Sequence, residues 1–370
     1  MKLFEYMGKR LLADFGISIP QGTVCSSPYE AVQAFLRLKG PAVIKAQVLS
    51  GKRGKHGGVR MVDNEQDAFA AAQDLLQAKV QGYPVEKVLV EEKLAIDQEV
   101  YVSITVNRQS KCPVLIASAQ GGMDIEAVPM DQIVRQNLDV ALGLPVFLAR
   151  DITRRLGVDP SSKPGKALAE LVQSVYRLFM AVDAELVEIN PAAICQDSVY
   201  AADAKITIDD ASMYRNTYLP VVDEKTEAER KANQLGLAYV DLDGDIGVMA
   251  NGAGITMATL DTITYLGKRP ANFLDAGKGA GQSVTSQGLE LVLAKKPQAV
   301  LVNIFGGITR CDDVARAITK VKKEQNSSIP IVVRLTGVNQ DSGRAILAEA
   351  GVEVFDEMQL AAQRAVELAN

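Results

Sequence analysis

The chain has 370 residues and is 48% hydrophobic, and its 40 Lys and Arg residues nearly balance 45 Asp and Glu residues, for a net charge of −5. This length predicts two or three domains, each with its own core. The charge excludes a broad basic surface for nucleic acid, although a local basic site for phosphates remains compatible with it.

The chain has four widely spaced cysteines and no CxxC pair, which excludes a zinc knuckle and a redox dithiol and favours reduced thiols. No window approaches the roughly 18 apolar residues that span a bilayer, and Glu5 and Lys9 interrupt the N-terminus where a signal peptide needs an apolar core. We therefore expect a cytoplasmic protein that binds neither a membrane nor nucleic acid.

The first half of the chain mixes short helices and strands. Apolar residues at helical spacing predict helices over 3–15, 28–38, 64–78, 144–156 and 164–182. Apolar or β-branched runs predict strands over 42–48, 58–62, 85–95, 98–109, 113–120, 184–190 and 198–206. Short polar breaks join the last four of these into two hairpins, so this half is α+β with antiparallel strands.

The pattern changes near residue 220. A charged stretch, 223–234, is typical of a solvated helix or a linker. Beyond it, helical patterns alternate with apolar runs over 245–251, 271–277, 299–307, 329–337 and 352–356, and a helix is expected over 357–369. Near-continuous apolar strands separated by helices predict a doubly wound parallel sheet. We place the domain boundary near residue 235, which gives domains 1–235 and 236–370.

Three strands of the second domain end in glycine-rich segments, 251–254, 277–281 and 306–309. Ligands of open parallel sheets bind at the carboxyl ends of the strands. Glycine there lets backbone amides approach an anion, and the helix after Gly307 would direct its positive end at that anion. A tight turn explains any one segment equally well. Three such segments at one edge favour a ligand site.

In the first domain, Lys45 lies on an apolar strand just before 51–58, a stretch with four glycines and four basic residues. The chain has neither a P-loop nor a dinucleotide fingerprint, so a lysine beneath a glycine-rich flap is the alternative way to hold phosphates. A solvated basic hairpin is the competing interpretation. The stretch also holds the chain's single histidine, His56, so a histidine relay elsewhere needs a second chain.

A second polar cluster combines Glu188 and Asn190 with Asp203 and Lys205. Strand periodicity puts the members of each pair on one face, and the hairpin turn brings the two strands side by side. Oxygen ligands from Asn and Asp suit Mg²⁺ bound with a triphosphate. The exposed polar face of a hairpin explains these residues equally well.

Long segments of the chain also resemble a known family. LFEYMGKRLLADFGISIP, SGKRGKHGGV, LVEEKLAIDQEVYVSI, and VEINP followed by AADAKI resemble the ATP-grasp half of the β subunits of ADP-forming succinyl-CoA synthetases. NGAGITMATLD, PANFLDAGKGA and VLVNIFGGITRCD resemble their C-terminal half. The resemblance covers essentially the whole chain, and it implies an α/β fold: an α+β ATP-grasp domain followed by a flavodoxin-like doubly wound domain.

The family's reaction implies a relay between two chains. ATP phosphorylates a histidine of an α subunit, the phosphoryl group passes to succinate, and coenzyme A displaces it to give succinyl-CoA, reversibly. The β subunit supplies the ATP/ADP and Mg²⁺ site, and the α subunit supplies the phosphohistidine and most of the coenzyme A site. The single histidine of this chain agrees with that division.

The resemblance also implies roles for individual residues. Nucleotide contacts fall on Lys45, Lys52, Arg53, Gly54, Glu91, Leu94 and Glu99. Magnesium ligands fall on Asn190 and Asp203, and Glu188 corresponds to a catalytic carboxylate facing the phosphohistidine. The acid-substrate positions are Asn251, Gly307, Ile308 and Thr309.

Several residues depart from the family pattern. Lys52 and His56 replace a glycine and an alanine in the flap, Lys278 replaces a glycine, and Thr309 stands where an aliphatic residue is usual. A solvated role is expected for His56. Because most departures lie at the substrate-side loops, malate or another dicarboxylate is an alternative to succinate, and a non-catalytic nucleotide-binding regulatory module is a further one.

Overall fold

The computed structural model describes residues 1–49, 53–80, 82–223, 225–277, 279 and 281–369. The chain divides into two compact units, Met1–Glu224 and Lys225–Asn370. The boundary predicted near residue 235 falls at the end of helix α6 (Glu227–Gln234), which packs on β13 (Ala238–Asp241). Lys52 and Lys278 lie outside the described residues.

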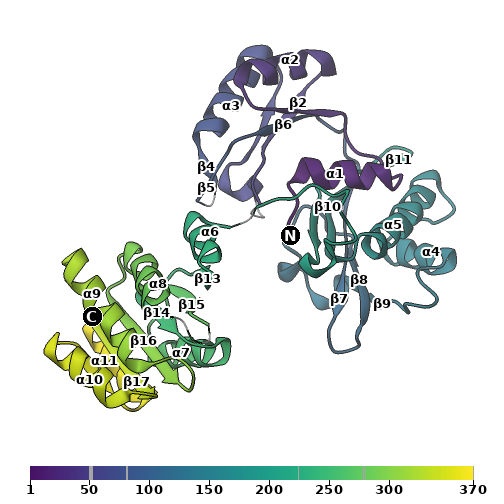
Figure 1. The fold of residues 1–370 in the computed structure, drawn as a ribbon. Coiled ribbons are helices and arrows are strands. Elements are labelled where there is room, and N and C mark those ends of the chain that lie inside the picture. Colours follow the sequence, from purple (N-terminus) through teal and green to yellow (C-terminus); the bar gives the residue numbers. More distant parts are fainter. Residues whose placement is uncertain (50–52, 81, 224, 278, 280, 370) are drawn as a thin grey trace. The chain divides into compact units, whose positions relative to one another are not determined.

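The first unit begins with an antiparallel sheet in the order β1-β6-β2-β3, covered on one face by two helices (Figure 1). The helices are α2 (Pro28–Leu38) and α3 (Glu65–Gln77), capped by the side chains of Ser27 and Asn64. The strands are β1 (Gly22–Cys25), β2 (Ala42–Ala46), β3 (Val59–Val62) and β6 (Val88–Glu92). Strand β2 alternates, so Ile44 is buried against the helices while Lys45 is on the opposite face.

The second sheet of this unit has the order β11-β10-β7-β8-β9, and β12 also pairs with β10. Its strands are β7 (Gln98–Asn107), β8 (Cys112–Ser118), β9 (Ile133–Asn137), β10 (Ala184–Cys195), β11 (Ser198–Ala201) and β12 (Lys205–Ile208). Helices α1 (Glu5–Asp14), α4 (Val146–Arg155) and α5 (Lys163–Ala181) share its apolar core. Both predicted hairpins are confirmed, as β7–β8 and β10–β11.

Short elements connect these layers. They are strands β4 (Lys79–Val80) and β5 (Tyr83–Pro84), and 3₁₀ turns over Arg53–His56, Ile125–Ala127, Met130–Gln132 and Asp210–Ser212. Helix α1 approaches the chain near β12 closely, because a Cβ added to Gly8 would lie 3.3 Å from the Cβ of Ala204. This approach places the buried side chains of Glu5 and Lys9 beside the loop that joins β11 to β12.

The second unit is a doubly wound sheet in the order β13-β15-β14-β16-β17-β18, parallel except for β13. The strands are β14 (Ile246–Ala250), β15 (Asn272–Asp275), β16 (Ala299–Gly306), β17 (Ile331–Gly337) and β18 (Glu353–Phe355). Helices α7 (Ala253–Tyr265) and α11 (Met358–Leu368) pack on one face, and α8 (Gln282–Ala294), α9 (Cys311–Gln325) and α10 (Gln340–Glu349) pack on the other. The five parallel strands follow the flavodoxin-like order 2-1-3-4-5, which confirms the predicted fold.

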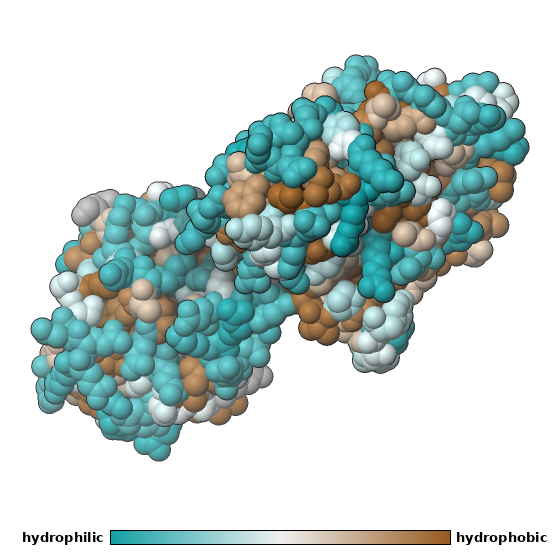
Figure 2. Space-filling model, turned by 90° about the horizontal axis from the view of Figure 1, so that it is seen from above, coloured by the Kyte–Doolittle hydropathy of each residue, from teal (hydrophilic) through white to brown (hydrophobic). Residues whose placement is uncertain are grey.

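The surface seen in Figure 2 is largely hydrophilic, with hydrophobic residues in separate groups. Within the described ranges, none of the helices is both long and apolar enough to cross a membrane.

Gly337 ends β17 with a φ of 125°, and an added Cβ would collide with the backbone of Gly306 at the end of β16. Gly337→Ala should therefore lower the free energy of unfolding by about 1–3 kcal/mol from backbone strain alone. Gly254→Ala is the matched control, because that helical glycine has open space around it and should gain stability from helix propensity. Equal free energies of unfolding of the two variants in urea titrations would contradict the strain assigned to the backbone at Gly337.

Candidate active site

The first unit contains a cavity of about 510 Å³ that is lined from both of its sheets. Nine of the predicted site residues line it: Lys45, Arg53, Gly54, Glu91, Leu94, Glu99, Glu188, Asn190 and Asp203. A larger hollow of about 720 Å³ lies beside α2 and α3, but none of the predicted residues lines it. The gathering of basic, acidic and amide side chains marks the smaller cavity as the candidate active site.

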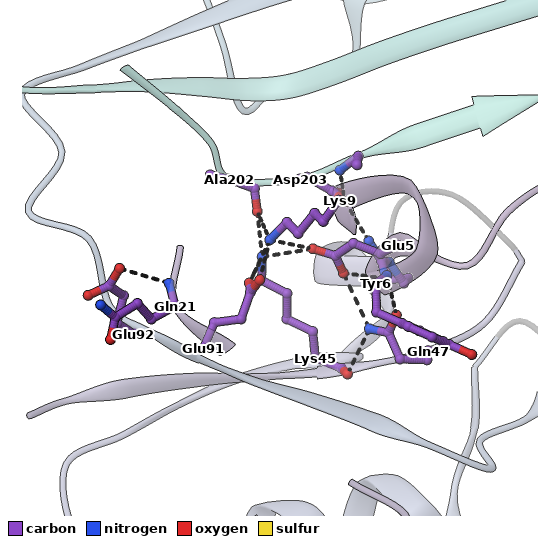
Figure 3. A network of polar contacts seen from close by, with 12 residues as sticks. Glu5, Tyr6, Lys9, Gln21, Lys45, Gln47, Glu91, Glu92, Ala202 and Asp203 are labelled. Atoms are coloured by element: carbon purple, nitrogen blue, oxygen red, sulfur yellow. Dashed lines mark hydrogen bonds and ion pairs between the residues drawn. The ribbon is translucent and has the colours of Figure 1, made fainter. Parts of the chain in front are cut away.

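Lys45 stands at the centre of a buried network of charges (Figure 3). Its Nζ lies 3.0 Å from Glu5 Oε1 and 2.9 Å from Glu91 Oε2, and it donates a 2.6 Å hydrogen bond to the carbonyl oxygen of Ala202. Burial lowers the pKa of the Lys45 ammonium, but the two carboxylates outweigh burial and raise that pKa above its usual value. Lys45 is therefore a fixed cation in the cavity wall.

Lys9 holds the network from behind. Its Nζ lies 2.5 and 2.7 Å from the two oxygens of Glu91, and it donates a 2.9 Å hydrogen bond to the carbonyl oxygen of Ala202. Glu91, predicted to contact the nucleotide, is 2% exposed and directs its carboxylate at the two lysines. In this arrangement, Glu91 supports the lysines.

Arg53 connects the network to the predicted metal ligands. It begins the 3₁₀ turn Arg53–His56, and its guanidinium lies 2.7 Å from Glu5 Oε2 and 2.7 Å from Asp203 Oδ1. Burial raises the pKa of Glu5, but the charges of Arg53, Lys45 and Lys9 together hold it well below its usual value. The described pairs thus join three cations to three carboxylates: Lys9, Lys45 and Arg53 to Glu5, Glu91 and Asp203.

Asn190 and Asp203 present oxygen atoms on the same cavity. The Oδ1 of Asn190 accepts a 2.8 Å hydrogen bond from the Gly122 amide, and its Nδ2 donates to the carbonyl oxygen of Met123. The side chain of Asp203 is 40% exposed, and its Oδ1 accepts hydrogen bonds from Arg53 and from the Ala204 amide, whereas Oδ2 accepts none from the described part of the chain. A carboxylate and an amide oxygen are a donor set that suits Mg²⁺, provided phosphate oxygens and water complete the shell.

Glu188 lies on β10 opposite Lys205 of β12. Its side chain is 21% exposed, and its carboxylate is 3.8 Å from Lys205 Nζ. Burial raises the pKa of Glu188 above the usual value; Lys205 opposes this change, and Asp203, Glu126 and Asp124 add to it. A carboxylate with a raised pKa, at a cavity wall, has the character of a proton acceptor or of an orienting group.

The other predicted nucleotide residues lie around the rim. Gly54 has open space beside its Cα, and Leu94 is half-buried in the loop after β6. Glu99 pairs with Ala193 of β10 and packs tightly on Gly122, because a Cβ added to Gly122 would collide with Oε2 of Glu99. His56 is exposed at the end of the 3₁₀ turn.

The predicted acid-substrate residues lie in the second unit, at the carboxyl edge of its sheet. Asn251 exchanges two hydrogen bonds with the backbone of Phe305, at 2.9 and 2.8 Å. Ile308 is 70% exposed, whereas Thr309 is 2% exposed and its Oγ1 accepts a 3.1 Å hydrogen bond from the Gly279 amide. Helix α9 begins at Cys311, so its first turn lies directly after these residues.

Glu5 and Lys9 belong to the site but were not predicted to do so from the sequence. They were noted only as charges that interrupt an apolar N-terminus. Their spacing carried a signal, because residues 5, 9 and 12 share one face of a helix and Leu12 is buried on that face. Two opposite charges on the buried face of a helix indicate a partner across the core.

Comparisons with known proteins agree with this architecture. The chain matches the ATP-grasp domain family over residues 2–194 and the CoA-ligase family over residues 249–368. The β subunits of ADP-forming succinate–CoA ligase from Staphylothermus marinus and Chloroflexus aurantiacus are 42% and 41% identical to it, and each alignment covers 100% of this chain and 99% of the relative. The structure of ATP citrate lyase from Methanothrix soehngenii, in complex with citrate and coenzyme A, shares the fold with a TM-score of 0.68 at 18% identity, covering 99% of both chains.

An ATP-grasp domain followed by a CoA-ligase domain defines an acid–CoA ligase of the ATP-grasp superfamily. At about 40% identity over its full length, the chain belongs to the family of β subunits of ADP-forming succinate–CoA ligases. It is therefore a subunit of a ligase, which favours the enzyme over the regulatory module considered from the sequence.

Because burial raises the pKa of Glu188, its ionised form destabilises the folded state. Glu188→Gln should raise the free energy of unfolding above the raised pKa. The gain should disappear below about pH 4.3, where Glu188 is protonated in both the folded and unfolded states. Urea titrations at pH 7 and pH 4 measure this difference. Glu185→Gln, an exposed change on the same strand, is the control, and a pH-independent effect of Glu188→Gln would contradict the assignment.

Proposed function

We propose that this chain binds Mg²⁺–ATP in the cavity of its first unit and transfers the γ-phosphoryl group to a histidine of a partner α-type subunit. The phosphoryl group then passes to succinate, and coenzyme A, bound mainly by the partner, displaces it to give succinyl-CoA. The observation that carries the proposal is the meeting of fixed cations and oxygen donors on one cavity, represented by Lys45, Arg53, Asn190 and Asp203.

The cations would bind the phosphates. Lys45 and Arg53 stand on the cavity wall with their charges held by carboxylates behind them, so they meet a triphosphate without a large rearrangement. Asn190 and Asp203 would hold Mg²⁺, which when bound neutralises charge on the phosphate oxygens. Leu94 and Glu99, at the rim, would contact the nucleoside, with Gly54 leaving room for the flap to approach the phosphates. Lys52, which directly precedes Arg53 in the sequence, would add a further contact to the phosphates.

Glu188 would act on the visiting histidine. A carboxylate that accepts a hydrogen bond from one imidazole N–H orients the ring and stabilises the positive charge that forms as the opposite nitrogen attacks phosphorus. Glu188 and Asp203 line the same cavity, which supports a role for Glu188 close to the proposed magnesium site.

The acceptor histidine would come from another chain. The only histidine here, His56, is exposed at the end of the 3₁₀ turn. The working enzyme would be a hetero-oligomer in the cytoplasm. The four cysteines of this chain are free thiols, which agrees with a reducing compartment.

The acid would bind in part at Asn251 and at Gly307, Ile308 and Thr309, beside the first turn of α9. A hydroxylated acid such as malate would be favoured if the Thr309 hydroxyl were free to read its extra oxygen. Thr309 is only 2% exposed, and this burial of its side chain supports succinate instead.

The double substitution Asn190→Ala and Asp203→Ala should reduce ATP-dependent labelling of the partner subunit by at least about 100-fold, because Mg²⁺ loses both protein ligands. The measurement uses the assembled complex, γ-labelled ATP and detection of acid-labile phosphohistidine. Asp197→Ala, in the exposed turn of β10–β11, is the control and should leave labelling unchanged. Undiminished labelling in the double variant would overturn the assignment of the metal ligands.

A further inference from the structure

The carboxylate of Glu5 touches every cation of the buried network. Glu5 Oε1 lies 3.0 Å from Lys9 Nζ and 3.0 Å from Lys45 Nζ, and its Oε2 lies 2.7 Å from Arg53 Nη1. These three cations come from α1, from β2 and from the 3₁₀ turn Arg53–His56 of the glycine-rich flap. With a side chain only 1% exposed, Glu5 is screened from solvent.

The orientation of Glu5 is itself fixed. Gln47 donates through Nε2 to Glu5 Oε2 at 3.4 Å, while its Oε1 accepts a 3.1 Å hydrogen bond from the Tyr6 amide (Figure 3). Lys9 lies only four residues further along α1, so it fixes Glu5 within the same helix. The carboxylate therefore presents one oxygen to Lys45 and the other to Arg53 from a rigid position.

The stability of the fold does not explain this arrangement. Replacing buried ion pairs by apolar side chains of similar volume is often neutral or stabilising, so a fold has little to gain from several charges placed around one carboxylate. Glu5 lines the cavity together with Lys45 and Arg53 and pairs with both. Its contacts fix where those two positive charges stand relative to each other.

We propose that Glu5 is a positioning residue for the nucleotide: its carboxylate aligns Lys45 and Arg53 so that both engage the phosphates of Mg²⁺–ATP at once. This inference rests on the proposed function. Because its side chain is only 1% exposed, Glu5 would act through the two cations and not by direct contact with nucleotide or metal. Because Arg53 also pairs with Asp203, the same carboxylate helps to hold the flap next to a proposed metal ligand.

Two variants separate position from charge. Glu5→Gln keeps the size of the side chain and removes the charge, whereas Glu5→Asp keeps the charge and shortens the reach, so that one carboxylate no longer spans Lys45 and Arg53. Both should weaken binding of Mg²⁺–ATP to the full chain by about 10–100-fold, the usual effect of removing a group that supports binding residues. Asp14→Asn, an exposed change on the same helix, is the control and should bind like the wild type.

Calorimetric titration of the full chain with Mg²⁺–ATP gives the dissociation constant and the binding stoichiometry separately. A merely structural role would lower the stoichiometry, as the folded fraction falls, and leave the dissociation constant unchanged. In the assembled complex, kcat/KM for ATP should fall by the same factor while KM for succinate stays constant. Wild-type affinity in both variants, or tighter binding by Glu5→Gln, would overturn the inference.

Failure of the proposed function would look different. In that case the wild-type complex itself would neither bind Mg²⁺–ATP nor label its partner. If the wild type binds and labels while Glu5→Asp, which keeps the charge balance needed for folding, matches it, only the role of Glu5 is refuted.

Discussion

A buried set of mutually compensating charges is the constraint on which the active site depends. Ions taken out of water cost several kcal/mol each unless partners surround them, and removing one partner of a buried pair typically destabilises by about 3–5 kcal/mol. Here the carboxylates of Glu5, Glu91 and Asp203 form ion pairs with the cations of Lys9, Lys45 and Arg53. The network joins α1, β2, β6, the flap and the β11–β12 loop, so the site forms only when all five segments are in place.

This network explains how one cavity keeps positive charge ready for phosphates. An uncompensated lysine in such a place would lose its proton or remain hydrated. Lys45 keeps its charge because carboxylates lie behind it, and the cavity receives the cation already desolvated and oriented. Glu188 shows the opposite condition: burial and nearby carboxylates disfavour its charge, which suits a group that acts on a proton.

Much of this architecture could be predicted from the sequence. The apolar run that includes β2 and the regular succession of helices and apolar strands after residue 245 are local patterns, and both led to the correct fold. Resemblance to a family then brought Lys45, Asn190 and Asp203 together across about 160 residues, as the cavity does. Local patterns failed for β1, β9 and β13, whose sequences lack a long apolar run and which form through pairing with β6, β8 and β15. They also failed for the short hairpin of β4 and β5.

The contacts of individual side chains could not be predicted from the sequence. Glu5 and Lys9 looked like interruptions of an apolar helix because their partners, Glu91 and Ala202, are distant in the chain. Glu91, predicted to contact the nucleotide, does line the cavity, but its contacts with the two lysines could not be predicted from the sequence. Thr309, predicted to lie at the acid-substrate site, is buried, and the contact of its Oγ1 with the Gly279 amide was not predictable either. Each outcome depends on packing between distant segments, which periodicity does not encode.

The central claim is that this chain binds and activates the nucleotide while a second chain supplies the phosphoryl acceptor. The most direct measurement incubates the purified chain with γ-labelled ATP and Mg²⁺, alone and after assembly with an α-type subunit, and locates the acid-labile phosphate. The account predicts stable label only in the assembled complex, on a histidine of the partner, with identical labelling when His56→Gln replaces the wild type. Label on this chain, or formation of succinyl-CoA by this chain alone, would contradict it.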